Sequence, residues 1–555
     1  MRVQPLCRFA QQEGPHNFSS YRYRHLVIVV SLILLAFCGP VAALALSWHD
    51  GEGPYYISTA EELAELASLV NGGNNFSGRA IRLSEDIDLS GYENWTPIGS
   101  SLTQFLGEFD GREHAVFNMK AVGGVNTGLF GYAGNGAKIR NLDLVDFSIQ
   151  STSSSSNNTG VGCLVGYNGG AVENVSSNGV ITGSGYIGGL VGWNSVAGTV
   201  SNSNARVEVT GTSTTGGLVG QNYGVISDCA ATGSAASTGN GAGIGGLVGA
   251  NNGVYSKISN SATNTRVKGG TLANIGGLAG YNGGYVSGSA ANGEVGVSGA
   301  FESPKAGGLV GDNIGSVADS AASGNITVAI SIKTYDTHIG GLIGDNKSES
   351  KSHYIVSNNA ASGNVSVNYS AGSSRMYVGG FIGNNESGIL SRDNVYDRQA
   401  AAQNAGMGYN VNASGGVKGA TTAELTPSPQ DASSNLGDSW TASKWTFFQG
   451  HYPQPRPLAE SANPLARRIS AIASAPVLFG NSTDTSRNMT VPFRVPRATA
   501  GTLHANLQWT QDEQRTLKFY SKRGDDKYWH AGWGQIDSDK EVALTATDAL
   551  GCTKE

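Results

Sequence analysis

A seven-residue motif, Gly-Gly-Leu-Val-Gly-x-Asn, recurs through the middle of the chain and constrains the fold more than any other feature. Near-identical copies begin at residues 188, 216, 245, 276, 307, 340 and 379, and weaker copies begin at 128 and 162. Successive copies are 26 to 39 residues apart. A repeat of this length indicates a solenoid, in which each unit buries its apolar side against its neighbours.

The residues between the motifs favour short strands. Each copy precedes a piece such as Thr199-Val-Ser and then a β-rich piece such as Arg206-Val-Glu-Val-Thr. Three strands and three turns account for one coil, so we predict an all-β, right-handed parallel β-solenoid (β-helix). The motif leucines would point inward, and the paired glycines would permit positive φ and close backbone approach. Small Ala and Ser residues, as in Ser320-Ala-Ala, would suit the narrow side of the coil.

The last motif position is asparagine in every near-identical copy. Because these residues share one register, their side-chain amides can bond to one another along the stack as a ladder. The predicted ladder is structural and contains Asn194, Asn222, Asn251, Asn282, Asn313, Asn346 and Asn385.

The first 45 residues are predicted to be a Sec-type signal peptide. Arg22 and Arg24 precede an uncharged apolar stretch over 26–46, which contains the small-residue site Ala43-Leu-Ala45. The alternative is an uncleaved membrane anchor through residues 26–46, because the stretch is long enough to span a bilayer. The protein is therefore expected to be secreted or exposed at the cell surface, and to have no membrane segment once the signal is removed.

Both ends of the predicted solenoid carry distinct segments. Residues 46–127 contain a helix over 59–70, with a capping box at Thr59, and the first coils; the helix would cover the open strand edges. The repeats occupy 128–390, and 391–457 would form a C-terminal cap in which Trp440, Trp445, Phe447 and Phe448 seat on the last coil. The prolines up to 457 indicate a linker. Residues 458–555 would contain this linker and a small β-sandwich-like domain.

Composition limits the classes of function. The net charge is −6 and the pI is about 5.9, so no basic field favours a nucleic-acid partner. After the signal only Cys163, Cys229 and Cys552 remain, without a CxxC pair, so the chain is not a disulfide scaffold. Cys163 and Cys229 are expected to be small buried side chains.

The motif resembles the GLUG motif of secreted and surface proteins of bacteria, which include large adhesins and the N-terminal, non-catalytic regions of immunoglobulin-A metallopeptidases. The helix at 59–70, Phe105-Leu-Gly-Glu-Phe-Asp-Gly111 and the segment 395–457 are also similar to those proteins. The resemblance covers roughly residues 55–457. It implies a bacterial stalk or adhesin-like architecture, and it implies no reaction, because the members share a stalk rather than an activity.

Motifs that carry chemistry are absent from the sequence. None of the nine histidines forms the His-Glu-x-x-His zinc pattern of the metallopeptidases, so that mechanism is excluded. A polysaccharide lyase or hydrolase on a β-helix remains the alternative, with Asp312, Asp319 and Asp345 as the few candidate carboxylates. Asp312 and Asp345 stand at the variable x position, which we expect to be a solvent-facing turn. We therefore predict no catalytic, metal or cofactor-binding residues and no cofactor.

The x position is the one part of the motif that is free to vary. Its occupants would lie along one edge of the rod, and exposed Tyr and Trp are typical of recognition surfaces. The candidate ligand-facing residues are Tyr167, Trp193 and Tyr281. We therefore predict a non-enzymatic, adhesin-like surface protein whose partner is an extracellular protein or glycan.

Overall fold

In the computed structural model the chain divides into two units, Met1–Gly51 and Glu52–Glu555. It describes His49, residues 53–474 and six strands between 493 and 554; within 53–474 it leaves out residues 153–158, 240–242, 271–272, 302, 333–335, 348–354, 371–374, 387–388, 391–392, 412–415, 427–435 and 449. The predicted signal peptide lies outside the described residues. Among the described helices, none is long and apolar enough to cross a membrane.

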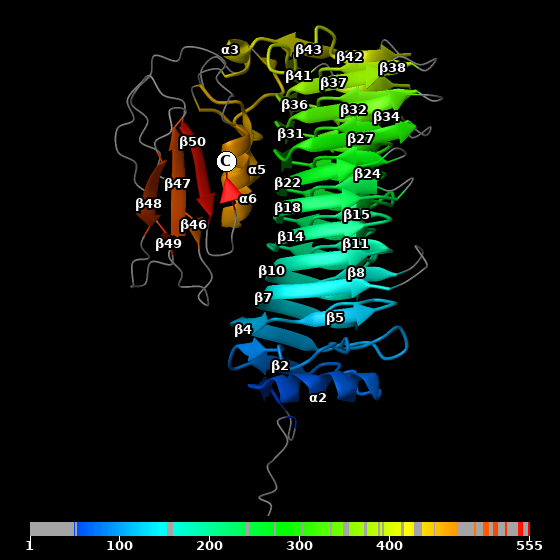
Figure 1. Cartoon of the computed structure of the whole chain (residues 1–555), viewed down its shortest axis with the longest axis vertical. Coiled ribbons are helices and arrows are strands. Elements are labelled where there is room, and N and C mark those ends of the chain that lie inside the picture. Colours follow the sequence, from blue (N-terminus) through cyan, green and yellow to red (C-terminus); the bar gives the residue numbers. More distant parts are fainter. Residues whose placement is uncertain are drawn as a thin grey trace, which may run out of the picture. The chain divides into compact units, whose positions relative to one another are not determined.

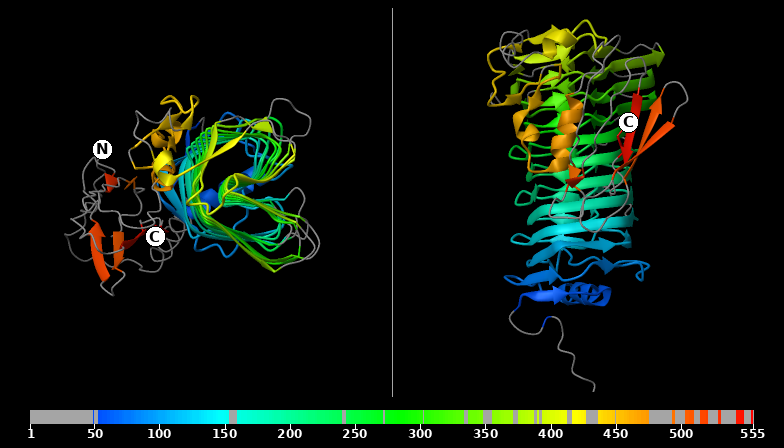
Figure 2. Two further views of the ribbon diagram at one scale, coloured as in Figure 1. Left: turned by 90° about the horizontal axis from the view of Figure 1, so that it is seen from above. Right: turned by 90° about the vertical axis from the view of Figure 1, so that its left-hand side faces the viewer.

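The repeats form a parallel β-solenoid, which confirms the predicted fold class (Figure 1). One coil contains β11 (Tyr186–Gly188), β12 (Val191–Asn194), β13 (Thr199–Ser201) and β14 (Asn204–Gly211). These strands belong to three sheets, which we call sheets 1, 2 and 3. Sheets 1 and 2 receive one strand from each coil that reaches them, and sheet 3 receives two from this coil and three from several later ones. Seen from above, successive coils lie over one another in Figure 2.

Sheets 1 and 2 are narrow and contain the motif. Sheet 1 comprises β8 (Gly160–Gly162), β11, β15 (Thr215–Gly216), β19 (Gly243–Gly245), β23 (Asn274–Gly276), β28 (Lys305–Gly307), β33 (Thr337–Gly340) and β38 (Met376–Gly379). Sheet 2 comprises β6 (Phe130–Ala133), β9 (Val165–Asn168), β12, β16 (Val219–Asn222), β20 (Val248–Asn251), β24 (Ala279–Asn282), β29 (Val310–Asn313), β34 (Ile343–Asn346), β39 (Ile382–Asn385) and β42 (Met407–Asn410).

Sheet 3 is the wide face and bends once in each coil. Before the bend lie β13, β17 (Val225–Ser227), β21 (Lys257–Ser259), β25 (Tyr285–Ser287), β30 (Ser316–Ala318), β35 (Ile355–Ser357) and β40 (Ile389–Leu390). After it lie β14, β18 (Ala230–Ser237), β22 (Ala262–Gly269), β26 (Ala290–Ala291), β27 (Val295–Phe301), β31 (Ala321–Ala322), β32 (Ile326–Ile332), β36 (Ala360–Ala361), β37 (Val365–Ser370), β41 (Asn394–Asp397) and β43 (Val417–Ala420). The first coils supply β1 (Tyr55–Ile57), β2 (Ala80–Leu83), β3 (Ile87–Asp88), β4 (Glu108–Phe117), β5 (Lys120–Gly123), β7 (Lys138–Ser151) and β10 (Ala171–Gly183).

The bend of sheet 3 is made by residues in the left-handed backbone region. Asn202, Asp228 and Asn260 have φ values of 46°, 55° and 52° on successive coils. Asn, Asp and Gly tolerate this conformation better than other residues do. The same position is occupied in other coils by Asn141, Asn174, Gly288, Asp319 and Asn358, all with positive φ. The sequence analysis did not identify this second periodic position.

The motif leucines point inward as predicted, because Leu190, Leu218 and Leu247 are fully buried. The interpretation of the paired glycines was wrong in one respect. Positive φ is not recorded at Gly188 or Gly189, although it is at other glycines. Close backbone approach alone explains their presence.

All three motif glycines leave no room for a side chain. A Cβ at Gly188 would lie 2.1 Å from the carbonyl oxygen of Val191, and one at Gly189 would lie 2.1 Å from the carbonyl oxygen of Gly217 in the next coil. A Cβ at Gly192 would lie 2.1 Å from the backbone nitrogen of Val161 in sheet 1. Sheets 1 and 2 therefore lie backbone against backbone, and this contact requires glycine at the three motif positions.

Gly277→Ala is expected to destabilise the protein by about 3 kcal/mol, since overpacking against fixed backbone costs this much. A Cβ there would lie 2.1 Å from the carbonyl oxygen of Gly308. Gly270→Ala is the matched control, because nothing lies within 4 Å of its Cβ position. Urea unfolding of the two variants measures the difference, and equal midpoints would contradict the steric explanation.

A helix covers the N-terminal end of the stack, as predicted. Helix α2 spans Ala60–Asn71, and its cap, Thr59, forms a capping box with Glu62. Its buried face contains Leu63, Leu66, Ala67 and Val70. Figure 1 shows α2 beneath β2, at the end of the coils.

The C-terminal segment differs from the linker expected on its prolines. Gln454–Pro455 form β45, which pairs with β44 (Trp445–Thr446), and Arg456–Ala459 form helix α5. Helix α6 (Pro464–Ala473) packs against β22 and β26, on the side of the solenoid. Trp440 and Trp445 are buried, but against Ala360 and Val395 on the side of the coils, and Phe448 is half exposed. Helix α3 spans Thr422–Leu425.

Six further strands follow. Strands β47 (Leu503–Trp509), β48 (Gln514–Phe519), β50 (Val542–Thr547) and β51 (Thr553–Lys554) form an antiparallel sheet, and β46 (Phe493–Arg494) pairs with β49 (Tyr528–Trp529). These pairings agree with a β-rich C-terminal region.

Candidate functional site

The motif asparagines form a continuous buried ladder on sheet 2. Asn194 Nδ2 donates to Asn222 Oδ1 at 2.8 Å, and Asn222 Nδ2 donates to Asn251 Oδ1 at 2.7 Å. The same bond repeats through Asn282, Asn313, Asn346 and Asn385. The ladder also extends beyond the expected set, to Asn168 at one end and Asn410 at the other.

Five of the ladder amides also hold the turn that follows them: Asn168, Asn194, Asn222, Asn282 and Asn313. Asn222 Nδ2 donates to the carbonyl oxygen of Gly224, and Asn222 Oδ1 accepts from the Gly224 amide. Both side-chain atoms are therefore satisfied without water, although Asn222 is fully buried. The ladder thus explains why asparagine recurs, and it leaves this position no freedom to bind a ligand.

Asn251→Ala is expected to cost about 2–4 kcal/mol, because it removes one hydrogen bond from each of two buried amides and opens a small cavity. The partners that lose a bond are Asn222 and Asn282. The adjacent Asn252→Ala removes only a 3.4 Å contact to the Tyr223 hydroxyl and serves as the control. Thermal unfolding measures both, and a loss no larger than that of the control would refute a stabilising ladder.

The x residues stack in register next to the ladder. Trp193 pairs with Tyr167 on one side and Gln221 on the other. They lie within strands rather than in the solvent-facing turn that we expected. Gln221, Asp312 and Asp345 are buried, and Tyr167 and Trp193 are half-buried.

Tyr167 and Trp193 join one cluster of aromatic rings. The Tyr167 ring stacks on Tyr132 with centroids 4.2 Å apart, and it lies 5.6 Å from Trp193. Tyr186 meets Trp193 edge-on at 5.2 Å, and Tyr223 stacks on it at 5.8 Å. Burial, together with the neighbouring Tyr167 hydroxyl, raises the pKa of Tyr132 to about 12. The Tyr132 hydroxyl therefore remains a neutral donor at physiological pH.

The third candidate, Tyr281, is not part of this cluster. It is half-buried on β24, where it pairs with Ala250 and Asp312, and Ala250 and Gln221 separate it from Trp193 along the stack. The sequence analysis missed Tyr132, which occupies the x position of the weakest motif copy. It also missed Tyr186 and Tyr223, which stand outside the motif.

An exposed apolar corner borders the cluster. The turn that connects sheet 2 to sheet 3 carries Val196, Tyr223 and Tyr255 on successive coils. Val196 is 76% exposed and Tyr255 is 84% exposed, and Tyr285, which follows on β25, is 39% exposed. We call Trp193, Val196, Tyr223, Tyr255 and Tyr285 the aromatic corner. Exposed apolar side chains gathered in this way are typical of interaction sites.

The x position changes from aromatic to charged further along the stack. Asp312 and Asp345 are in-register neighbours on β29 and β34. The Lys305 ammonium lies 2.5 Å from Asp312 Oδ2 and 3.0 Å from Asp345 Oδ2. His338 Nδ1 and Lys347 Nζ also approach Asp345 Oδ2, at 3.3 Å and 3.2 Å. The position between the two carboxylates is therefore occupied by the chain's own ammonium group.

Burial acts on both carboxylates, but their surroundings differ. Burial raises the pKa of Asp312, and the charge of Lys305 offsets this only in part. Burial also acts to raise the pKa of Asp345, but hydrogen bonding and charge from His338, with the charge of Lys305, bring the net pKa well below its usual range. Burial lowers the pKa of Lys305 less than the two carboxylates raise it.

These shifts predict opposite effects of acid. Asp345, whose folded pKa is lowered, contributes stability that is present above about pH 4 and is lost as the pH falls through that folded pKa. Asp312, whose folded pKa is raised, contributes stability that is present below about pH 4 and is lost as the pH rises through its folded pKa. Asp345→Asn should therefore flatten the loss of stability on acidification, whereas Asp312→Asn should steepen it. Urea unfolding between about pH 3 and about pH 7 tests both signs, and parallel pH profiles would contradict them.

The three candidate carboxylates of the enzyme alternative all carry ion pairs. Asp312 and Asp345 share Lys305, and Asp319 lies on sheet 3, 3.1 Å from Lys444 Nζ. Glycoside hydrolysis needs two carboxyl groups that face one substrate from opposite sides. Asp312 and Asp345 instead face one lysine.

Comparison with known proteins agrees with the repeat described above. A family model described as the GLUG motif matches residues 211–236. The unit at residues 211–236 therefore matches the GLUG motif. Halomucin from Haloquadratum walsbyi is 30% identical over 154 residues, which are 25% of this chain and 2% of halomucin. The chain thus spans a very small part of that relative. A crystal structure from Bacteroides ovatus, provisionally described as an immunoglobulin A1 protease, is 24% identical with a TM-score of 0.35, over 50% of this chain and 77% of that one.

Proposed function

We propose that this GLUG-repeat solenoid is a secreted or cell-surface, adhesin-like protein that binds an extracellular glycan or protein through its aromatic corner. The observation that carries the proposal is the exposure of Tyr255, Val196 and Tyr285 beside the half-buried Trp193 cluster. In a chain with only 14% charged residues, this corner supplies large rigid contact surfaces at low entropic cost.

The surroundings favour recognition of an uncharged or weakly charged surface. Asn252 and Gln221 lie beside the rings, and the Asn252 amide contacts the Tyr223 hydroxyl. Lys257, on β21, is the charged side chain between Val225 and Tyr285. Aromatic rings with amide and hydroxyl groups can pack on the apolar faces of a partner and bond its polar groups together.

The relatives support the location rather than the ligand. The resemblance to bacterial GLUG proteins implies export to the surface, and the partial match to halomucin is compatible with it. The predicted Sec-type signal over residues 1–45 supplies the route in this proposal. A glycan lyase or hydrolase is the second candidate, but the ion pairs of Asp312, Asp319 and Asp345 give it no support.

Tyr255→Ala is expected to weaken ligand binding about tenfold or more, since truncation of a central aromatic residue removes a large share of binding energy. Because Tyr255 is 84% exposed, the substitution should change the free energy of unfolding of the protein by less than about 0.5 kcal/mol. An array of immobilised glycans and extracellular-matrix proteins, probed with the purified full chain, identifies the ligand and then compares the variants.

Tyr56→Ala is the control, because Tyr56 is a 44% exposed tyrosine on β1, in the first coil. It should bind as the unmodified chain does. Retention of full affinity in Tyr255→Ala would refute the aromatic corner as the binding surface. Cleavage of polysaccharides on the same array would favour the enzyme alternative instead.

A further inference from the structure

Sheet 3 carries a column of small side chains directly after its bend. Strand pairing places alanine at the same position on five successive coils, and Asn204 precedes them while Val395 follows. The column consists of Ala230, Ala262, Ala290, Ala321 and Ala360. Nearer the N-terminus the same position is polar, with Asp143, Ser176 and Asn204. The alanine column therefore has a defined length along the rod.

The chain's own C-terminal segment, residues 436–474, covers this column. Leu458, Ala466 and Ile469, from helices α5 and α6, pack on Ala230, Ala262 and Ala290. Trp440, Trp445 and Tyr452 pack nearer the other end, on Ala360 and Val395. The two tryptophan rings stack with centroids 4.4 Å apart. We call residues 436–474 the strap; α5 and α6 lie alongside the coils in Figures 1 and 2.

Polar bonds fix the strap where the alanines end. Asn463 Nδ2 donates to Asn204 Oδ1 and to the carbonyl oxygen of Asp228, both at 2.8 Å. These bonds join residues 259 and 235 positions apart in the sequence. The contact with Asn204 coincides with the change of the column from alanine to polar residues.

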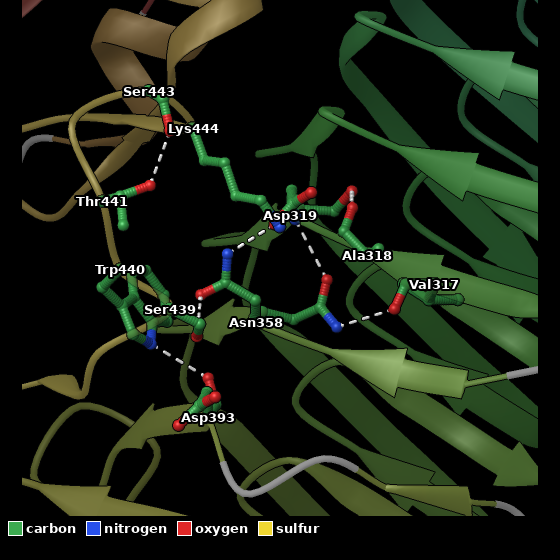
Figure 3. A network of polar contacts seen from close by, with 12 residues as sticks. Val317, Ala318, Asp319, Asn358, Asp393, Ser439, Trp440, Thr441, Ser443 and Lys444 are labelled. Carbon is green, nitrogen blue, oxygen red and sulfur yellow. Dashed lines mark hydrogen bonds and ion pairs between the residues drawn. The ribbon is translucent and has the colours of Figure 1, made fainter.

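The other half of the strap bonds to the bend of sheet 3. Lys444 Nζ lies 3.1 Å from Asp319 Oδ1, and Ser439 Oγ donates to Asn358 Oδ1 at 3.1 Å (Figure 3). The Trp440 indole donates to the carbonyl oxygen of Asp393 at 3.0 Å. The strap therefore uses the left-handed Asn and Asp residues that form the bend.

We propose that the strap is a lock that couples the coils from Asn204 to Asp397 into one cooperative unit, and that the alanine column is its docking surface. In a solenoid each coil contacts only its neighbours, so stability is a sum of nearest-neighbour terms and the ends open first. The strap adds contacts between coils that are far apart along the stack. Opening any coil beneath it then requires the release of the strap.

Alanine suits this role for a geometric reason. A larger side chain would hold the helices away from the strand backbone, and a polar one would be buried without a partner. Pro457 lies close enough to the bend that its Cγ would be 3.5 Å from a Cβ at Gly288. The coils on which the strap packs closely thus carry small side chains at the positions that face it.

Hydrogen exchange of the full-length chain tests the lock. Ile469→Asp places a charge under α6, where Ile469 is buried, whereas Ala471→Asp places one on the exposed side of the same helix. Ile469→Asp should speed exchange roughly tenfold or more at the amides of Ala230, Ala262 and Ala290, which bond to neighbouring coils. The exchange rates of the β4 amides should not change, because β4 belongs to a coil that the strap does not cover.

Ala471→Asp should exchange as the unmodified chain does at all these amides. Equal exchange of the two variants in β18, β22 and β26 would overturn the lock, as would acceleration confined to α6. Should Ile469→Asp not fold, Ile469→Ala gives the graded form of the same comparison. Unfolding in urea should then change from one transition to two as the strap is weakened, and a single unchanged transition would equally overturn the proposal.

Discussion

The whole stack depends on the contact between sheets 1 and 2, where backbone lies directly against backbone. Gly188, Gly189 and Gly192 each face a different backbone atom at a distance that admits no Cβ. The contact repeats in every coil that carries the motif. The glycines therefore set the spacing of the two sheets, and the buried leucine and the asparagine ladder follow from that spacing.

Such a close contact leaves the corner of each coil without water, so the polar groups there need partners within the protein. The asparagine amide supplies two at once, because it bonds to the next coil and to its own turn. The side chain at the x position does not have to supply these hydrogen bonds. It therefore takes rings near Trp193 and an ion cluster near Asp345, and these departures from the repeat are where function can be encoded.

Much of this could be predicted from the sequence, because the motif specifies local contacts between adjacent coils. The solenoid and the inward leucines were predicted from the repeated motif, of which Leu190 is one copy. The capping helix was predicted from the capping box at Thr59. The positive φ assigned to the glycine pairs was wrong, because composition does not distinguish freedom of φ from lack of space. The bend at Asn202 and Asp228 recurs in the sequence as Asn, Asp or Gly, and this signal could have been found.

The strap could not have been foreseen, because its polar contacts with the coils join residues between 47 and 259 positions apart and no repeat marks them. The alanine pairs gave an ambiguous signal, since a small residue fits both a narrow coil and a covered face. Both explanations hold: Ala322 lies against the motif glycine Gly308, whereas Ala290 lies under the strap. One residue of the pair serves the core and the other serves the docking surface. The side of the rod that is covered by its own chain is closed to a partner, whereas the aromatic corner, which carries Tyr255 in the open, is accessible to the partner that we propose.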